Sequence, residues 1–405
     1  MTLLKFVGRR AFGGLAFAAA LLFSSYAGAF VAKEPALDVT DVGLLKEIEA
    51  GGFRFSDAIG AAGADSLATL HEKSAVYRNL AETISADVNA LRAEMKSNGR
   101  PLFEVTDGNV GRVMDLRWLR SPYARLRLVG VVNRLDKRDF DLGETCGETR
   151  FIYRMAYQIA DPAFPKPLSS RMPFNVNVVY SVKKPAGEDC AAAARAWIPD
   201  RDLSTPRERL GWLTAAPLNP SKLTLKQIEI NAQIVRFPSG QETEFGGQAA
   251  YVLRIFRAEQ RDGRLTLVPK LLENTPDVER IRNDHALRAK LVDYLNANIV
   301  GVDRGVFVLP DEFLTTKAIS YSTFGSARLA NHPFAQFLIP NDFVGADYSK
   351  TSFVKSPRGV IERLDNASCM GCHQTNATAG FHFIGFDDAA TSSLNRLKMA
   401  VSPHY

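Results

Sequence analysis

The composition of this chain fits a folded protein with no basis for nucleic-acid binding. It has 405 residues, 46% of them apolar, and a formal net charge of +6. Three of the 50 basic residues and none of the 44 acidic ones lie in the predicted leader described next, so the mature chain carries only +3. This apolar content is enough for one large core or two domains, and disorder is not the default. With no Lys/Arg-rich run and no nucleic-acid motif, we expect no DNA or RNA partner.

Residues 1–29 have the three parts of a secretory signal peptide. These parts are a positive region (Lys5, Arg9, Arg10), an apolar region (11–23) and a small-residue cleavage site (Ala27-Gly28-Ala29). Cleavage would make Phe30 the first residue, so the protein is predicted to be periplasmic or secreted. Because Phe30 is not a cysteine and the apolar run is short, we expect no stable membrane anchor after cleavage. Arg9-Arg10 also fits a twin-arginine leader, which leaves the export route open.

Residues 30–100 are predicted to be a helical segment. Apolar residues recur at every third or fourth position, namely Leu67, Leu70, Val76, Leu80, Ile84, Val88 and Leu91. Asn98-Gly99 followed by Pro101 is predicted to end this helix. His71 lies inside it without a recognisable partner, which favours a packing or surface role.

Residues 101–330 are predicted to form a β-rich body. The β-branched and aromatic runs that predict strands are 125–136, 150–159, 172–182, 226–237, 249–259 and 263–272. Asn175 and Asn177 alternate with Phe174, Val176 and Val178, as in a sheet with one buried face. Consecutive strands favour an antiparallel sheet, so the predicted fold class is α+β.

One strong helix interrupts these strands over residues 274–299. Thr275 is its predicted N-cap, Pro276 occupies the first helical position and Asp277 lies in the first turn. His285 lies on this helix, and nothing around it forms a catalytic triad. We therefore expect a surface or packing role for His285.

Cys146 and Cys190 are predicted to form a structural disulfide, since cysteines in exported proteins pair more often than they stay free. The charged stretch around Cys146 contains Asp136, Asp139, Asp141, Glu144 and Glu148. Alternating charges of this kind favour a solvated, salt-bridged loop over a substrate or ion site.

The motif with the most specific chemistry is Cys369-Met370-Gly371-Cys372-His373. Two thiols and a following imidazole at this spacing are what covalent haem attachment requires, because the thiols add to the porphyrin vinyls and the imidazole binds iron. A zinc site would need a second Cys or His pair, and a thioredoxin-like pair would need a βαβ unit. The sequence contains neither of these contexts. The alternative to haem attachment that remains is a disulfide or redox pair formed by Cys369 and Cys372.

Through these five residues the chain resembles the c-type cytochromes. The resemblance implies one covalent haem c, thioether bonds at Cys369 and Cys372, and His373 as the proximal iron ligand. It covers about a tenth of the chain and departs from small cytochromes c, whose motif lies near their start. Only 32 residues follow His373. We therefore expect the segment 331–405 to pack on the β-rich body, which supplies part of the haem pocket.

The leading candidate for the distal ligand is His382, in the stretch Gly380–Phe386. In an extended segment, alternation would direct Phe381 and Phe383 away from the iron and His382 towards it. Met399, His404 and His332 are the alternatives.

Two function classes follow from these features. The first is an exported monohaem protein that transfers electrons to an unknown periplasmic redox partner, or a haem enzyme with an open distal site. The second is an exported structural or binding protein whose two motif cysteines form a disulfide or redox switch without haem. No other enzyme signature is present, so whether the protein is an enzyme is left open.

Overall fold

A computed structural model describes residues 38–97, 112–141, 143–160, 162–163, 167–184, 186–187, 189–237, 248–322, 329–373, 380–385 and 401. The predicted signal peptide, Met399 and His404 lie outside these residues.

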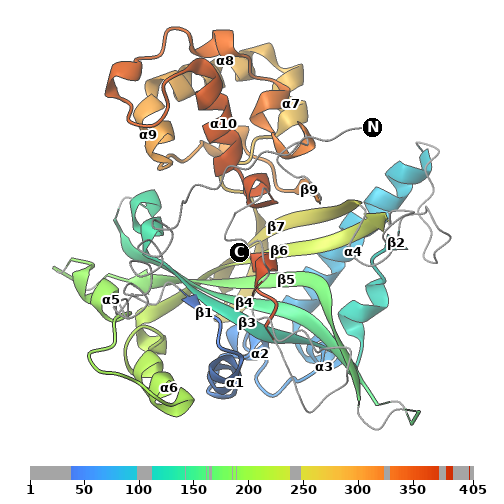
Figure 1. Cartoon of the computed structure of the whole chain (residues 1–405). Helices are drawn as coiled ribbons and strands as arrows, with labels where there is room; N and C mark the ends of the chain where they lie inside the picture. Colours follow the sequence, from blue (N-terminus) through green and yellow to red (C-terminus); the bar gives the residue numbers. More distant parts are fainter. Residues whose placement is uncertain are drawn as a thin grey trace, which may run out of the picture.

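The centre of the molecule is one nine-stranded antiparallel sheet (Figure 1). Its main path runs β1-β3-β4-β5-β6-β7-β8, with β2 paired to β6 and β9 paired to β7. The strands are β1 (Asp38–Val39), β2 (Arg112–Val113), β3 (Ala124–Arg134), β4 (Thr145–Ile159), β5 (Leu168–Lys183), β6 (Leu223–Phe237), β7 (Gln248–Arg261), β8 (Arg264–Lys270) and β9 (Ala318–Ser322). All six strands predicted from the sequence are present, and the α+β fold class is confirmed.

Side-chain alternation gives the sheet one apolar and one polar face. On β5, Phe174, Val176 and Val178 are buried in the main core, whereas Asn175 and Asn177 point to the opposite face. The register connects this face across three strands, because Asn177 is opposite Glu229 on β6, which is opposite Ile255 on β7. The face is therefore polar on β5 and β6 and becomes apolar at β7, where Ile255 is buried.

The N-terminal helices cover the apolar face. They are α1 (Val42–Ala50), α2 (Phe55–Ala58), α3 (Leu67–Lys73) and α4 (Ala75–Ser97). Leu80, Ile84 and Val88 of α4 are almost completely buried in the same core as the strands. The periodic run expected to be one helix is divided at Ser74, whose hydroxyl accepts a hydrogen bond from Tyr77 N at 3.1 Å. Such a cap favours the start of a new helix.

The predicted disulfide is present and joins Cys146 to Cys190, with an S–S distance of 2.11 Å. It connects the start of β4 to the residue that precedes α5 (Ala191–Arg195), and α6 (Pro206–Ala215) follows. The 44-residue separation makes this a long covalent loop around β4 and β5.

A second core is formed by helices that gather at one end of the sheet (Figure 1). They are α7 (Val278–Asn283), α8 (His285–Ala297), α9 (Ile299–Arg304) and α10 (Pro357–Ala367). The prediction of one helix capped by Thr275 was wrong, because the structure has two helices. Asp277 accepts from Arg280 N and caps α7, and Asp284 accepts from Leu287 N and caps α8. Two aspartates at cap spacing compete with a single continuous helix.

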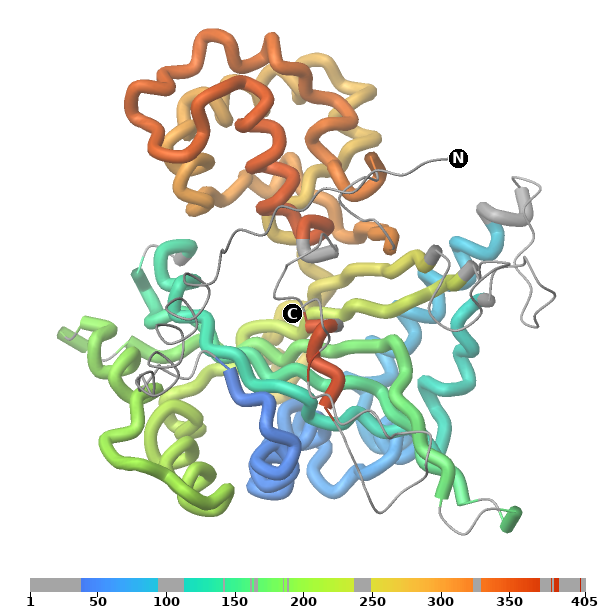
Figure 2. The backbone as a smooth tube through the Cα atoms, viewed as in Figure 1, coloured from blue at the N-terminus to red at the C-terminus, as the bar shows by residue number. Residues whose placement is uncertain are grey.

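The C-terminal segment 380–385 returns to the sheet and crosses the face opposite α1–α4 (Figure 2). Phe383 is fully buried there against Val129, Val132 and Ile152. Gly130 makes room for the ring, since a Cβ at this position would lie 2.4 Å from Phe383 Cδ1. Arg154 Nη1 also donates to the Phe383 carbonyl at 3.2 Å, which fixes the segment to β4.

Candidate functional site

The cysteine motif follows directly from the end of α10. Residues Cys369–His373 form the 3-10 turn η10. The Ser368 hydroxyl donates to the Asp365 carbonyl at 2.7 Å, and Gly371 N donates to the Ser368 carbonyl at 2.9 Å. Gly371 is required for this tight turn, because a Cβ there would lie 2.4 Å from the Asn366 carbonyl oxygen.

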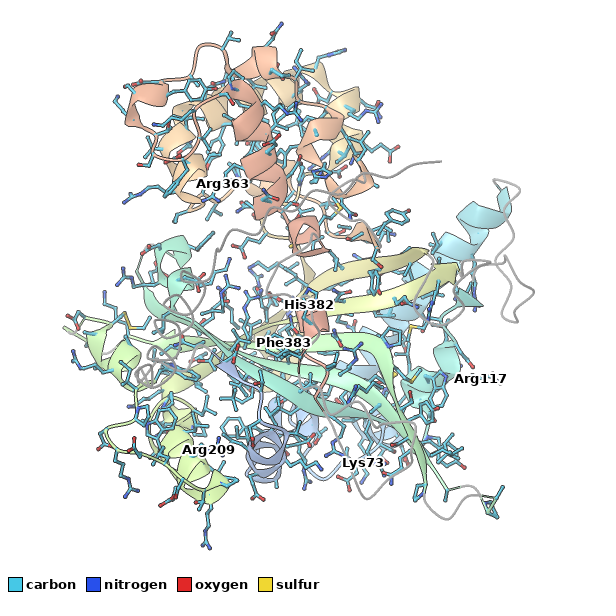
Figure 3. All side chains as sticks on the ribbon, viewed as in Figure 1. Lys73, Arg117, Arg209, Arg363, His382 and Phe383 are labelled. Atoms are coloured by element: carbon cyan, nitrogen blue, oxygen red, sulfur yellow. A yellow bond between two sulfur atoms is a disulfide. The ribbon has the colours of Figure 1, made fainter. Side chains whose placement is uncertain are left out.

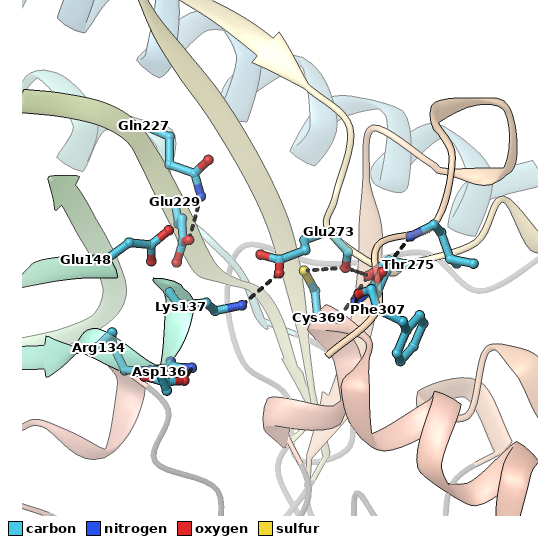
Figure 4. A network of polar contacts seen from close by, with 12 residues as sticks. Arg134, Asp136, Lys137, Glu148, Gln227, Glu229, Glu273, Thr275, Phe307 and Cys369 are labelled. Atoms are coloured by element: carbon cyan, nitrogen blue, oxygen red, sulfur yellow. Dashed lines mark hydrogen bonds and ion pairs between the residues drawn. The ribbon is translucent and has the colours of Figure 1, made fainter. Parts of the chain in front are cut away.

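Cys369 is held against the strand-to-helix connection that follows β8. Its backbone N donates to Thr275 Oγ1 at 2.9 Å, and its thiol donates to the Glu273 carbonyl at 3.5 Å (Figure 4). Thr275 is therefore a support for the motif rather than the helix cap expected from the sequence. The side chains of Cys372 and His373 lie outside the described residues, although their backbone belongs to η10.

Cys369 lines a cavity of about 310 Å³ between the polar face of the sheet and the segments that cover it. The β-strand wall contains Arg150, Asn175, Asn177, Glu229, Asn231, Leu253 and Ile255. The covering wall contains Arg134, Lys137, Phe140, Leu272, Glu273, Ser368, Cys369 and Gly380. This size lies at the lower end of the range for small-molecule sites.

The cavity has an apolar end beside the motif. Met370 is buried in a small cluster with Leu253, Ile255, Leu272 and Ala318, and Cys369 packs against it. Leu253 and Ile255 belong to β7, whereas Asn175 and Asn177 lie two strands away on β5. At about 4.8 Å per strand, roughly 10 Å separates the apolar end from the amide side chains.

The polar end is built around Arg150. Arg150 Nη2 lies 2.7 Å from Glu148 Oε2, and Nη1 lies 3.1 Å from Glu229 Oε2. Lys226 Nζ completes the group at 2.7 Å from Glu148 Oε1. Glu229 also accepts from Gln227 Nε2 at 2.8 Å (Figure 4) and from Asn177 Nδ2 at 3.3 Å.

The electrostatics of this group follow from burial and pairing. Burial by itself raises the pKa of Glu148, but the charges of Arg150 and Lys226 and their hydrogen bonds outweigh it and lower the pKa to about 2. For Arg150, burial acts to lower the pKa, and Glu229 and Glu148 more than offset this, so its pKa is raised. Both groups are therefore charged throughout the neutral range.

Two further ion pairs complete the lining. Lys137 Nζ lies 2.7 Å from Glu273 Oε1, and Arg134 Nη2 lies 2.8 Å from Asp136 Oδ2 (Figure 4). Arg134–Asp136 and Arg138–Asp139, the latter at 3.3 Å, lie within the stretch around Cys146 and agree with the expected salt-bridged loop. Glu148 of the same stretch differs from that expectation, because it is buried on β4 in the group around Arg150. The cavity lining is thus rich in charge, yet its charges are balanced locally.

His382 is buried in the 3-10 turn η11 (Gly380–His382), over the sheet next to Phe383 (Figure 3). The extended conformation assumed for this segment was wrong, so side-chain alternation no longer supports a direction for His382. Gly380 lines the cavity, whereas His382 is not among the lining residues of the described chain. Its role as distal ligand stays a prediction.

His332, one of the alternative ligands, lies next to a buried carboxylate at the end of α10. His332 Nδ1 is 3.4 Å from Asp365 Oδ2, and Asp365 Oδ1 accepts from Phe334 N at 2.8 Å. Burial raises the pKa of Asp365 to about 6, against the lowering effect of these contacts. The turn η6 (Leu329–Asn331), which precedes His332, contacts η10.

Several cavity residues were not recognised from the sequence. Arg150, Glu229 and Lys137 come from separate strands and turns, and only the register brings them together. A usable signal was the alternation on β6, where Gln227, Glu229 and Asn231 are interleaved with buried Ile228 and Ile230. This alternation predicts that polar side chains of β6 lie on one face of the sheet, as Asn175 and Asn177 of β5 do.

Within the described ranges, no group of three or more His, Cys, Asp or Glu side chains is placed to hold a metal ion. The helices of those same ranges include none with the length and apolar character needed to cross a bilayer. Comparisons with protein-family models, curated proteins and solved structures found no match.

Proposed function

We propose that this chain is an exported protein with one covalently bound haem c, attached through Cys369 and Cys372 and ligated by His373. The observation that carries the proposal is the five-residue motif itself, since this spacing suits two thioether bonds and an adjacent imidazole ligand. When bound, the haem would supply one-electron chemistry. The proposed role is electron transfer with an unidentified redox partner outside the cytoplasm.

The described residues around the motif fit such a group. Cys369 places a partly exposed thiol on the cavity wall. Leu253, Ile255 and Leu272 give it an apolar neighbourhood that excludes water. Arg134 and Lys137 bring cations into the same lining, where they suit the carboxylates of a porphyrin.

Protein isolated from the cell envelope provides the direct test. We expect a Soret band, and haem that stays with the polypeptide on a denaturing gel. Cys372→Ala should abolish normal double attachment, whereas Cys146→Ala should leave attachment unchanged. Protein without a Soret band, with a Cys369–Cys372 disulfide found by peptide mapping, would instead support a haem-free redox pair.

Export and the distal ligand have separate tests. N-terminal sequencing should begin at Phe30, and intact Met1 on the envelope protein would contradict cleavage. We propose His382 as the distal ligand, so His382→Ala should convert a low-spin spectrum to a high-spin one. An unchanged low-spin spectrum would exclude His382, and a high-spin wild-type spectrum would favour an open, catalytic iron.

A further inference from the structure

The first half of strand β3 has an open edge. Within the described chain, β1 pairs with β3 only at residues 131–132, so residues 124–128 have a partner strand, β4, on one side only. The Tyr123 carbonyl accepts from Gln158 N on the β4 side at 3.0 Å. Backbone groups of successive residues alternate in direction, so the N–H group of Leu126 faces the open edge. Such an edge presents donors that a further partner can use.

The side chain of Glu49 in α1 shows what this edge binds. Glu49 Oε2 accepts from Arg127 Nε at 3.0 Å, and Oε1 accepts from Leu128 N at 3.3 Å. One carboxylate therefore bridges a guanidinium group and the N–H group of the following residue, a pairing strengthened by charge. Arg125 and Leu126 repeat this pair of donors two residues earlier, about 7 Å along the strand.

The repeated pair of donors lines a second cavity, of about 310 Å³. It lies where α1, α2 and α3 contact β3 (Figure 1), and both Arg125 and Leu126 belong to its lining. In the described chain it shares no lining residue with the cavity beside Cys369. This site is therefore separate from the proposed haem pocket.

The described lining carries an excess of two positive charges. Its four basic and two acidic residues are Lys46, Arg54, Arg125, Arg127, Glu49 and Asp65. Glu49 is already bound by Arg127, and Asp65 lies 3.6 Å from Arg54 in an exposed pair. Among the residues that the structure describes, Arg125 has no hydrogen bond or ion pair. One turn before Glu49, α1 presents Lys46 to the cavity rather than a second acid, so the helix supplies no carboxylate for Arg125.

We propose that this cavity binds the carboxylate group of a small organic acid. One carboxylate oxygen accepts from the Arg125 guanidinium and the other from Leu126 N, as the oxygens of Glu49 do at the neighbouring pair of donors. Lys46 and Arg54 add positive potential around the bound acid. The volume of the cavity restricts the acid to a few carbon atoms. The inference goes beyond haem attachment and does not depend on it.

Calorimetric titration of the full-length mature protein at pH 7 and low salt tests the inference, with acetate and succinate as probes. At least one should bind with a dissociation constant below about 10 mM, and 0.3 M NaCl should weaken that binding several-fold. Succinamide, which lacks the charge, should bind at least about tenfold more weakly than succinate. No binding of either acid at 50 mM, equal binding of succinamide, or tighter binding of inorganic phosphate than of both acids would overturn the proposal.

Two variants connect binding to Arg125. Arg125→Gln should weaken binding about tenfold or more, and its unfolding midpoint should stay close to that of the wild type because Arg125 has no partner in the described chain. Arg264→Gln, at an exposed position at the start of β8, removes the same charge elsewhere and should bind as the wild type. Wild-type affinity of Arg125→Gln, or equal weakening in both variants, would refute a site at Arg125.

Nuclear magnetic resonance of the ²H,¹⁵N-labelled protein tests the backbone contact. The amide proton of Leu126 should shift downfield and saturate as acetate or succinate is added, because it gains a charged acceptor. The amide of Leu128 already donates to Glu49 and should shift much less. A Leu126 amide that does not respond to a bound acid would exclude the proposed geometry.

Discussion

Glu148 offers the sharpest test of the electrostatics, because it is a buried carboxylate between two cations. Its side chain is 3% exposed and lies 2.7 Å from both Arg150 and Lys226. Glu148→Gln keeps the shape and one acceptor but removes the charge. Arg150 would then retain only Glu229, at 3.1 Å, and would be left incompletely neutralised in a buried position.

The contribution of the Glu148 charge to the free energy of unfolding follows from its pKa, which is about 2 in the folded protein against an ordinary glutamate value of 4.5. A lowered pKa means that the folded state binds the proton more weakly, so the charged carboxylate stabilises the fold above pH 4.5. This difference corresponds to about 3 kcal/mol at pH 7. The contribution declines as the pH falls from about 4.5 and is lost near pH 2.

Urea unfolding of the wild type and of Glu148→Gln at pH 7 and pH 3 measures this contribution. We expect the variant to be about 3 kcal/mol less stable at pH 7, and the gap to narrow markedly at pH 3. Glu259→Gln is the control, because Glu259 also pairs with two arginines but near the surface, where exposed pairs contribute little. A gap of equal size at both pH values would refute the pairing argument.

Three further perturbations test other parts of the fold. Burial raises the pKa of Asp365 to about 6, so its ionisation should destabilise the fold as the pH rises from about 4 to 6. Urea unfolding should show the free energy of unfolding of Asp365→Asn rising by about 2 to 3 kcal/mol relative to that of the wild type between about pH 4 and pH 6. Free energies of unfolding that change with pH in parallel in the two proteins would contradict this. The Cys146→Ala, Cys190→Ala double variant should lose about 4 kcal/mol from opening the 44-residue loop, and equal unfolding midpoints would exclude such a role. Gly130→Ala should cost about 1 to 3 kcal/mol by displacing Phe383, whereas Gly211→Ala in open space on α6 should be neutral or stabilising. Rescue of Gly130→Ala by Phe383→Leu would identify the clash, and wild-type stability of Gly130→Ala alone would disprove it.

The sequence predicted those parts of the fold that depend on local patterns. Alternation on β5 separated Phe174 and Val176 from Asn175 and Asn177, and the structure places them on opposite faces. The disulfide could be predicted because, once the motif claims the other two cysteines, only Cys146 and Cys190 remain.

The failures have equally specific causes. Thr275 has the chemistry of a helix cap, but its hydroxyl accepts from Cys369, which is 94 residues away in the chain. The turn at Gly380–His382 could not be distinguished from a strand, since aromatic residues favour either when they pack on a sheet. The cavity itself depends on strand register, which sequence alternation does not determine.

The position of residues 380–385 also constrains the order in which the molecule is assembled. These residues are synthesised well after the strands they cover, since β3–β5 end at Lys183. Chains fold from the N-terminus as they emerge, so the sheet can form while its polar face is still uncovered. Gly380 then closes one wall of the cavity when Phe383 docks. This wall of the cavity is therefore completed only after the strands behind it have been synthesised.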